Sequence, residues 1–406
     1  MKIAYLSIEF VPRIFGGLGV YVDEISRELA GLGESISVFT QGGDNLKPRQ
    51  RMEGVDVFRY DPVPIRDGLD IFLSGETLAW GEGLLFFEEL LALNQLSAAG
   101  IVENGPFDLC VAHDWLGLWG GMAAKRKGVP LIYHVHGLEA GRSESPNPQL
   151  ISLERRGADV SDGIITVSEA MKRELVGLGA EAEKITVCYH GVNSGFFDPA
   201  RADAAALAAL RAGYGIAEGE TVILFVGRLE PVKGVRELLA ALPAVLAENP
   251  GVRLLLVGKG SLEGFVREQA RHLPPGKVIL VTEFLDAASK MHHYALADLC
   301  VFPSIYEPFG IVALEAAAMG RAAVVGTAGT SGLGEIVRNP ADPRPTGVHV
   351  NARNPADLAW GINLALEDEE RRRAWGENAR ERALTQFSWR RAAESTLEIY
   401  RRVAGQ

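Results

Sequence analysis

Short apolar runs alternate along the chain with longer stretches in which apolar residues recur at helical spacing. Residues 2–7 form such a run, 20–32 follow the helical pattern, and 35–40 form a second run. The same order restarts at 221–226 and continues through 257. Strands that alternate with helices in this way are typical of a parallel sheet covered by helices. The pattern therefore predicts two α/β domains, each a doubly wound, Rossmann-like parallel sheet.

The domain boundary is expected in the glycine-containing stretch 190–219, between the two runs of this pattern. We assign residues 1–192 to an N-terminal domain and 193–386 to a C-terminal domain. Residues 387–406 are predicted to form a helix that packs back on the first domain. Ligands of such sheets bind outside the carboxyl ends of the strands, so we expect a ligand cleft between the domains.

Composition narrows the class of protein. The chain has 406 residues, 47% of them hydrophobic, and a formal net charge of −11. This acidity argues against nucleic-acid binding, which needs a basic surface. The N-terminus reads directly into a strand, and no uninterrupted apolar run reaches about 18 residues. Three separated cysteines in apolar runs are typical of buried thiols. We expect a cytoplasmic protein without membrane association; the sequence does not indicate its oligomeric state.

A glycine-rich loop follows the first predicted strand and opens the first helix. Gly16 and Gly17, in Phe15-Gly16-Gly17-Leu18-Gly19, let backbone N–H groups approach an anion at the positive end of a helix. The spacing matches neither the dinucleotide-binding fingerprint nor the phosphate loop of nucleotide triphosphatases. The loop is predicted to bind an anion, and a tight turn is the alternative.

Two cations flank the loop after the strand at 221–226. Arg228 and Lys233 could both point into the cleft and offer a forked donor and a point charge to one diphosphate. Such cations would stabilise the charge that develops on a departing phosphate oxygen, and no metal ion would be required. Ordinary surface cations are the alternative interpretation.

Two carboxylates lie seven residues apart in the most specific motif, Glu307-Pro308-Phe309-Gly310-Ile311-Val312-Ala313-Leu314-Glu315. Glu307 precedes the predicted helix, and Glu315 lies two turns into it. The free N–H groups of Gly310, Ile311 and Val312 would meet a phosphate at the helix start. Glu315 is costly to bury without hydrogen bonds, which a ribose diol could supply. Two solvated glutamates are the alternative.

Two histidines share one face of the strand near residues 130–136. His134 and His136 could bind a metal, but no carboxylate or cysteine at ligand spacing completes a zinc set. We predict that His136, nearest the carboxyl end of the strand, bonds a sugar hydroxyl; a structural histidine is the alternative. Asp114 ends the preceding strand, and either serves the acceptor side or caps the next helix.

Taken together, these motifs resemble those of the retaining glycosyltransferases of the GT-B fold, group 1 type, and within them the glycogen and starch synthase-like branch. The resemblance extends over nearly the whole chain. It rests on Phe15-Gly16-Gly17-Leu18, His113-Asp114-Trp115, Val135-His136-Gly137, Gly227-Arg228-Leu229 with Lys233-Gly234, Val257-Gly258-Lys259-Gly260, Glu307-Pro308-Phe309-Gly310 with Glu315, and Phe387-Ser388-Trp389.

The resemblance implies a nucleotide diphosphate sugar held mainly by the second domain. Arg228 and Lys233 would contact the diphosphate and Glu315 the ribose. Glu307 would contact hydroxyls of the donor sugar, and His136 the sugar near its 6-position. The Gly16–Gly17 loop would reach the diphosphate as the domains close, and the motif match also places Gly258 at the donor site.

The implied activity is transfer of glucose from ADP-glucose or UDP-glucose to an α-glucan, with retention of the anomeric configuration and no metal ion or cofactor. The chain departs from the usual motifs at His190-Gly191-Val192-Asn193 and at Thr282-Glu283-Phe284. The second departure falls where the resemblance places the nucleotide base, so the choice between ADP-, UDP- and GDP-sugar stays open. Relatives that make small glycosides, sugar phosphates or cell-surface glycans share most of the motifs. A nucleotide-sugar epimerase and a non-catalytic nucleotide-sugar-binding protein are further alternatives.

Overall fold

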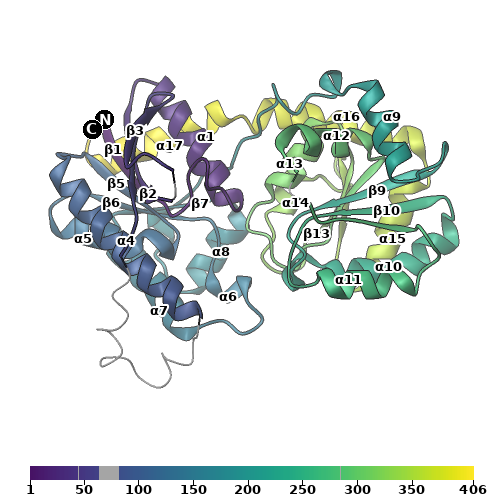
Figure 1. Cartoon of the computed structure of the whole chain (residues 1–406), viewed down its shortest axis with the longest axis horizontal. Coiled ribbons are helices and arrows are strands. Elements are labelled where there is room, and N and C mark those ends of the chain that lie inside the picture. The colour runs from purple at the N-terminus through teal and green to yellow at the C-terminus, as the bar shows by residue number, and fades with distance from the viewer. Residues whose placement is uncertain (44, 64–81, 284) are drawn as a thin grey trace.

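The computed structural model describes residues 1–43, 45–63, 82–283 and 285–406, which fold into two α/β domains lying side by side (Figure 1). Each domain is built on its own parallel sheet. The predicted fold class, two doubly wound sheets facing each other as in the GT-B fold, is confirmed.

The first domain contains an eight-stranded sheet in the order β3-β4-β2-β1-β5-β6-β7-β8. Among the described strands of this sheet, β3 pairs antiparallel with β4 and the others pair in parallel. The strands are β1 (Lys2–Leu6), β2 (Ser35–Gln41), β3 (Arg49–Met52), β4 (Val55–Tyr60), β5 (Leu109–His113), β6 (Leu131–Val135), β7 (Gly163–Thr166) and β8 (Ile185–Val187).

Helices cover both faces of this sheet (Figure 1). They are α1 (Gly17–Gly31), α4 (Glu82–Glu103), α5 (Leu118–Arg126), α6 (Glu139–Arg142), α7 (Pro148–Val160) and α8 (Glu169–Gly177), with short 3₁₀ turns at Trp115–Gly117 and Ala182–Lys184. By length and composition alone, most of α4 could cross a membrane. In the fold, α4 packs against α5 and the sheet, and Leu90 and Ile101 on its inner side are buried.

The second domain contains a six-stranded parallel sheet in the order β11-β10-β9-β12-β13-β14. Its strands are β9 (Thr221–Val226), β10 (Val252–Val257), β11 (Val278–Val281), β12 (Leu299–Phe302), β13 (Ala323–Gly326) and β14 (Gly347–Val350). The chain enters it through 3₁₀ turn Pro199–Arg201 and α9 (Ala204–Gly213). The remaining helices are α10 (Val235–Glu248), α11 (Glu263–Arg271), α12 (Ala287–Leu296), α13 (Ile311–Ala318), α14 (Leu333–Ile336), α15 (Pro355–Leu366) and α16 (Glu369–Gln386), with a 3₁₀ turn at Pro231–Lys233.

The central strands are apolar along their whole length because helices bury both of their faces. All five residues of β5 are buried, as are the last five of β9. The three cysteines, Cys110, Cys188 and Cys300, are buried and unpaired, as their apolar surroundings predicted.

Helix α17 (Trp389–Ala404) leaves the second domain and packs against α1 of the first. Its buried residues include Leu397 and Tyr400, whose hydroxyl lies 2.8 Å from that of Tyr5 on β1. Within the described residues, the chain crosses between the domains twice, and the two crossings are adjacent: the Val192 N–H donates to the Phe387 carbonyl at 2.9 Å. Both chain termini therefore lie on the first domain (Figure 1).

Candidate active site

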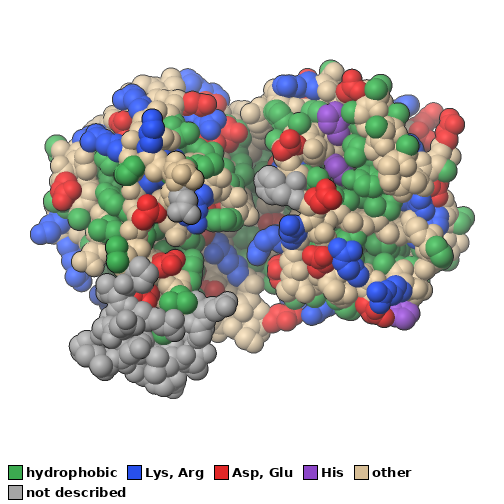
Figure 2. Space-filling view, in the orientation of Figure 1, with side chains coloured by type: hydrophobic (Ala, Val, Ile, Leu, Met, Phe, Trp, Pro, Cys, Tyr) green, Lys and Arg blue, Asp and Glu red, His purple; other side chains and the backbone are tan. Residues whose placement is uncertain are grey.

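Most of the sequence-predicted site residues follow the carboxyl ends of strands or open helices, whereas Glu315 lies inside α13. Figure 2 shows a hollow between the two lobes, bordered by basic and acidic side chains. The N-terminal ends of α1 and α13 approach each other there, because a methyl group added to Gly17 would lie 3.5 Å from Ile311 Cδ1. Gly310 caps α13 with a φ of 107°, and a methyl group on it would collide with Leu333.

Helix starts carry N–H groups that have no partner within the helix, together with the positive end of the helix dipole. Gly16 and Gly17 supply one such end and Gly310, Ile311 and Val312 the other. The structure thus brings both predicted anion-binding loops to one place.

Lys233 and Glu307 form the central ion pair of this region. Lys233 Nζ lies 2.6 Å from Glu307 Oε2, and only 18% and 12% of the two side chains are exposed. Ser304 Oγ donates to the same carboxylate oxygen at 3.3 Å. Gly234 lets the Lys233 loop approach β12, since it has a φ of 70° and a Cβ there would lie 1.8 Å from the Pro303 oxygen. The alternative of an ordinary surface lysine is wrong for Lys233.

Arg228 lies apart from this ion pair. Its side chain is exposed and lines a cavity of about 370 Å³ together with Arg142 from the first domain. Ser143, Ser145 and Ser261 also line the cavity, with Glu144 and Glu230. The two predicted diphosphate ligands therefore border neighbouring parts of the cleft in this conformation.

Gly258 has a packing role that the motif did not reveal. Its φ is 150°, and a Cβ at this position would lie 1.8 Å from the Gly227 oxygen. The loops after β9 and β10 are in backbone contact here, and Leu229 N–H donates to the Lys259 carbonyl at 2.8 Å. Glycine at 258 is thus explained by close backbone approach, and its contact with the donor remains a prediction.

Glu315 is buried, with 5% of its surface exposed, so the alternative of a solvated glutamate is wrong. Its two oxygens are held by Lys290 Nζ and by the Tyr294 hydroxyl, the latter at 2.8 Å. The protein itself supplies the hydrogen bonds for which the sequence argument invoked a ribose. Burial of Glu315 is therefore no evidence for a ribose ligand.

His136 belongs to a buried cluster of aromatic and imidazole rings. Its Nε2 lies 3.0 Å from His113 Nδ1, and its ring stacks on His134 at 4.4 Å with an angle of 7° between the planes. Burial lowers the pKa of His136 well below its usual value, and lowers that of His113 to about 3. These histidines are therefore neutral at physiological pH.

The cluster does not have the geometry of a shared metal site. Ligand atoms of His113, His134 and His136 lie within 4.8 Å of one another. However, the stacked rings of His134 and His136 are almost parallel, and a metal binds a lone pair in the plane of each ring. The lone pairs of these two rings cannot converge on one ion.

Asp114 is buried and holds the His136 loop. It accepts from the His136 N–H at 2.6 Å and forms an ion pair with Arg142. It precedes the 3₁₀ turn Trp115–Gly117 but makes no side-chain capping bond, so the capping alternative is wrong. Its φ of 53° is unusual for a residue other than glycine, and strain of this kind gathers at functional sites.

Comparison with known proteins decides the family. Residues 16–191 match the Glycosyl transferase 4-like domain, and residues 208–382 match the Glycosyl transferases group 1 family. A glycogen synthase of Mycobacterium tuberculosis is 34% identical, over 98% of this chain and 94% of its own. The protein belongs to the group 1 glycosyltransferases of the GT-B fold.

Other similar proteins differ in their named activities. A D-inositol 3-phosphate glycosyltransferase of Kineococcus radiotolerans is 31% identical, over 99% of this chain and 95% of its own. The structure of a sucrose-phosphate synthase from Thermosynechococcus elongatus is 25% identical with a TM-score of 0.79, covering 100% of this chain and 99% of its own. The catalytic domain of starch synthase IV from Arabidopsis thaliana, bound to ADP and acarbose, has a TM-score of 0.79 at 16% identity, covering 100% and 99%.

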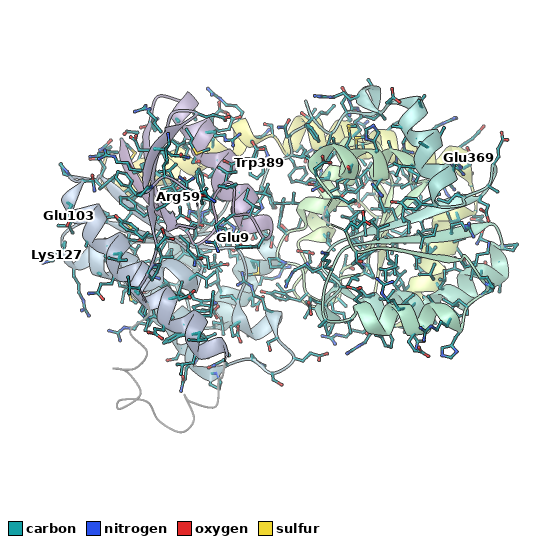
Figure 3. All side chains as sticks on the ribbon, in the orientation of Figure 1. Glu9, Arg59, Glu103, Lys127, Glu369 and Trp389 are labelled. Carbon is teal, nitrogen blue, oxygen red and sulfur yellow. The ribbon has the colours of Figure 1, made fainter. Side chains whose placement is uncertain are left out.

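Sequence reasoning missed the residue that contacts the glycine-rich loop of this glycosyltransferase. Glu9 Oε2 accepts N–H groups from Phe15 at 2.9 Å, Gly16 at 3.1 Å and Gly19 at 3.2 Å. Glu9 lies on the side of the first domain that faces the second (Figure 3). Three N–H groups of the loop are thus bonded by a carboxylate of the same chain, and contact of the loop with a donor diphosphate stays a prediction.

Further partners were also missed: Arg142 on Asp114, and Lys290 and Tyr294 on Glu315. No sequence motif linked these residues to their partners, because each pair is separated by 21 to 28 positions in the chain. The departure at Thr282-Glu283-Phe284 cannot be placed in full, since Phe284 lies outside the described residues.

Proposed function

We propose that this glycosyltransferase moves glucose from ADP-glucose or UDP-glucose to an α-glucan in the cytoplasm, with retention of configuration and without a metal ion. The observation that carries the proposal is the half-buried Lys233–Glu307 ion pair, in the region where the positive ends of α1 and α13 meet. Similarity to a glycogen synthase supports the choice of acceptor.

Donor binding would exchange the partners of the charged groups. Lys233 is neutralised by Glu307 in this structure, and a diphosphate would compete for the same cation. Once Lys233 turns to phosphate, Glu307 is free to accept hydroxyls of the sugar. Arg228 is exposed and has a long side chain, so it could reach the diphosphate from its own side of the cleft.

Positive charge placed in this way favours departure of the nucleoside diphosphate. Lys233, Arg228 and the N–H groups of Gly310, Ile311 and Val312 would stabilise charge on the leaving oxygen. These groups supply what a metal ion would otherwise supply. Glu315, held beside α12, would bond the ribose, and neutral His136 would bond a sugar hydroxyl. Closure of the two domains would exclude water from the reaction.

A donor screen tests the proposal. Purified protein in EDTA is given ADP-, UDP- or GDP-glucose with glycogen or maltooligosaccharide, and release of the nucleoside diphosphate is followed. Acceptor-dependent release and an α-linked product by NMR are expected. Release only with added divalent metal would contradict metal independence. Epimer formation or binding without transfer would favour an epimerase or a non-catalytic binding protein.

A sugar phosphate is the second candidate acceptor, because of the cavity at the domain junction. Arg142, Arg228 and three serines line it together with Glu144 and Glu230. The two guanidinium groups could bind a phosphate, and the carboxylates and serines could bond sugar hydroxyls. The D-inositol 3-phosphate glycosyltransferase relative supports this candidate. Adding inositol phosphate, glucose 1-phosphate and fructose 6-phosphate to the screen separates it from glucan transfer.

A further inference from the structure

The N-terminus of α8, in the first domain, is capped by a residue of the second domain. Glu335 on α14 accepts the Glu169 N–H through Oε2 and the Ala170 N–H through Oε1, both at 2.9 Å. The third free N–H, that of Met171, bonds Ser168 Oγ at 3.0 Å. Two of the three donors at this helix start therefore have a partner within the chain only while the domains are together.

A third donor from the first domain completes the contact. The Tyr189 hydroxyl donates to Glu335 Oε2 at 2.9 Å. A carboxylate at the positive end of a helix gains from the helix dipole, and hydrogen bonds to a charged acceptor are stronger than neutral ones. Glu335 thus makes a favourable interaction with the first domain that an open arrangement would lose.

The segment that carries Glu335 is tied to the backbone of Glu307. The Gly332 N–H donates to the Glu307 carbonyl at 2.8 Å, and the Glu307 N–H donates to the Thr330 carbonyl at 3.1 Å. On its other side, Arg382 of α16 donates to the carbonyls of Glu335 and Ile336. The segments that carry Glu335 and Glu307 are therefore joined by backbone hydrogen bonds within the second domain.

The residue next to Glu307 contacts the same end of α8. Ser168 Oγ donates to the Pro308 carbonyl at 2.7 Å. The start of α8 is therefore hydrogen-bonded to the second domain at two points, Glu335 and the Pro308 carbonyl. The Glu307 backbone is bonded to the segment that carries Glu335 and precedes Pro308. This contact sets the position of Glu307 relative to the first domain.

We propose that Glu335 is a positioning residue for glycosyl transfer, which holds the two domains in the arrangement of this structure and so places Glu307 and Lys233 opposite the Gly16–Gly17 loop. The proposal rests on the proposed function. Apparent donor affinity falls in proportion to the fraction of molecules in the competent state. Loss of the contact therefore raises the donor KM, while saturating donor can still draw the domains together.

Three variants test it. Glu335→Gln removes the charge and one acceptor, and Tyr189→Phe removes one donor of the same contact. Glu381→Gln is the matched control, because Glu381 is an ion-paired glutamate of the same domain, on α16, whose partner is Arg344. With ADP- and UDP-glucose as donors, we expect Glu335→Gln to raise the KM roughly tenfold, with kcat within twofold. Tyr189→Phe should give a smaller rise, and Glu381→Gln none.

Two measurements on the donor-free protein do not depend on turnover. Small-angle X-ray scattering should show a larger radius of gyration for Glu335→Gln than for the wild type. Hydrogen exchange should show faster exchange at the Glu169 and Ala170 amides. A merely structural role would lower the melting temperature and kcat at constant KM and radius, and that result would overturn the proposal.

Failure of the proposed function has a different signature. If the wild type binds neither nucleotide sugar, that function is wrong, while scattering and exchange still decide whether Glu335 holds the domains together. An unchanged radius and unchanged exchange in Glu335→Gln overturn the positioning role whatever the wild type transfers.

Discussion

Lys233 Nζ lies 2.6 Å from Glu307 Oε2, so the cation proposed for the leaving group is neutralised by the carboxylate proposed for the donor sugar. The two residues come from loops after β9 and β12, 74 positions apart in the chain. With 18% and 12% of the two side chains exposed, the opposite charges face each other in a place mostly shielded from solvent.

Replacing Lys233 by alanine tests its role at the leaving group. We expect Lys233→Ala to lower kcat by a factor of about 10² to 10³, as for loss of one donor to a developing anion. Steady-state kinetics measure the change. Lys277→Ala is the matched control, because Lys277 is also ion-paired and half-buried but precedes β11, at the amino ends of the strands, whereas Lys233 follows the carboxyl end of β9. Near-normal turnover of Lys233→Ala would contradict the proposed role of Lys233 in stabilising the leaving group.

Glu315→Gln should weaken nucleotide binding more than it slows chemistry. If Glu315 bonds the ribose, ADP and UDP should bind the wild type more tightly than their deoxyribose analogues do, and the variant should not distinguish them. Isothermal titration calorimetry measures both. Tyr294→Phe is the control for the surroundings of the carboxylate, because it removes the hydroxyl bond to Glu315 but leaves the charge. If the wild type and the variant prefer ADP and UDP over the deoxyribose analogues to the same extent, Glu315 does not contact the ribose.

Stability should fall in acid because of the buried histidines. Burial lowers the pKa of His113 and of His190 from 6.5 to about 3. Between these pH values the unfolded chain binds more protons than the folded one, so stability is lost as the pH falls below about 6.5. Each histidine contributes up to about 1.4 kcal/mol per pH unit in that range.

Comparison of His190→Asn with His272→Asn isolates the contribution of a buried histidine to the pH dependence of stability. Burial raises the pKa of Glu154 to about 7, which opposes the trend between pH 4.5 and 7, so the total slope is not diagnostic. His190→Asn should show a shallower slope of unfolding free energy against pH than the wild type, measured by urea denaturation from pH 4.5 to 7.5. His272→Asn, at an exposed position, should match the wild type. Equal slopes in all three would contradict a neutral, buried His190.

Helix α17 should contribute strongly to the stability of the first domain. Leu397 is buried in the same apolar cluster as Tyr5 and Tyr21. Leu397→Ala should therefore cost about 2 to 5 kcal/mol in unfolding free energy. Leu384→Ala is the control, since Leu384 on α16 is 41% exposed and should change stability by less than about 0.5 kcal/mol. Chemical denaturation followed by tryptophan fluorescence compares the two; a small effect at Leu397 would show that the α17 contact is weak.

The sequence was most informative where a pattern depends on local chain geometry. Continuous apolar runs such as 221–226 predicted buried strands, because a strand covered on both faces excludes polar residues. The glycine-rich loop at Gly16 and Gly17 was placed correctly before the first helix, which begins at Gly17. Alternation of strands and helices predicted two parallel sheets, since right-handed crossovers leave few other arrangements.

These patterns did not predict which side chains contact one another in the folded protein. Glu9 on the glycine loop, Arg142 on Asp114, Lys290 on Glu315 and Glu335 on α8 follow no spacing rule. Asp114 shows the difficulty: its position before a helical turn left a capping role open as one of two alternatives, yet its carboxylate bonds the His136 loop and Arg142.

By itself, the sequence determined the two α/β domains and the loops at which chemistry is expected, because both follow from periodicity and from the conformational freedom of glycine. The tertiary structure decided which charges face one another: Lys233 with Glu307, Glu315 with Lys290, and Glu335 with the start of α8. The physical reason is that an ion pair depends on distance and burial, and these are set by how the strands are ordered in each sheet and how the two domains meet.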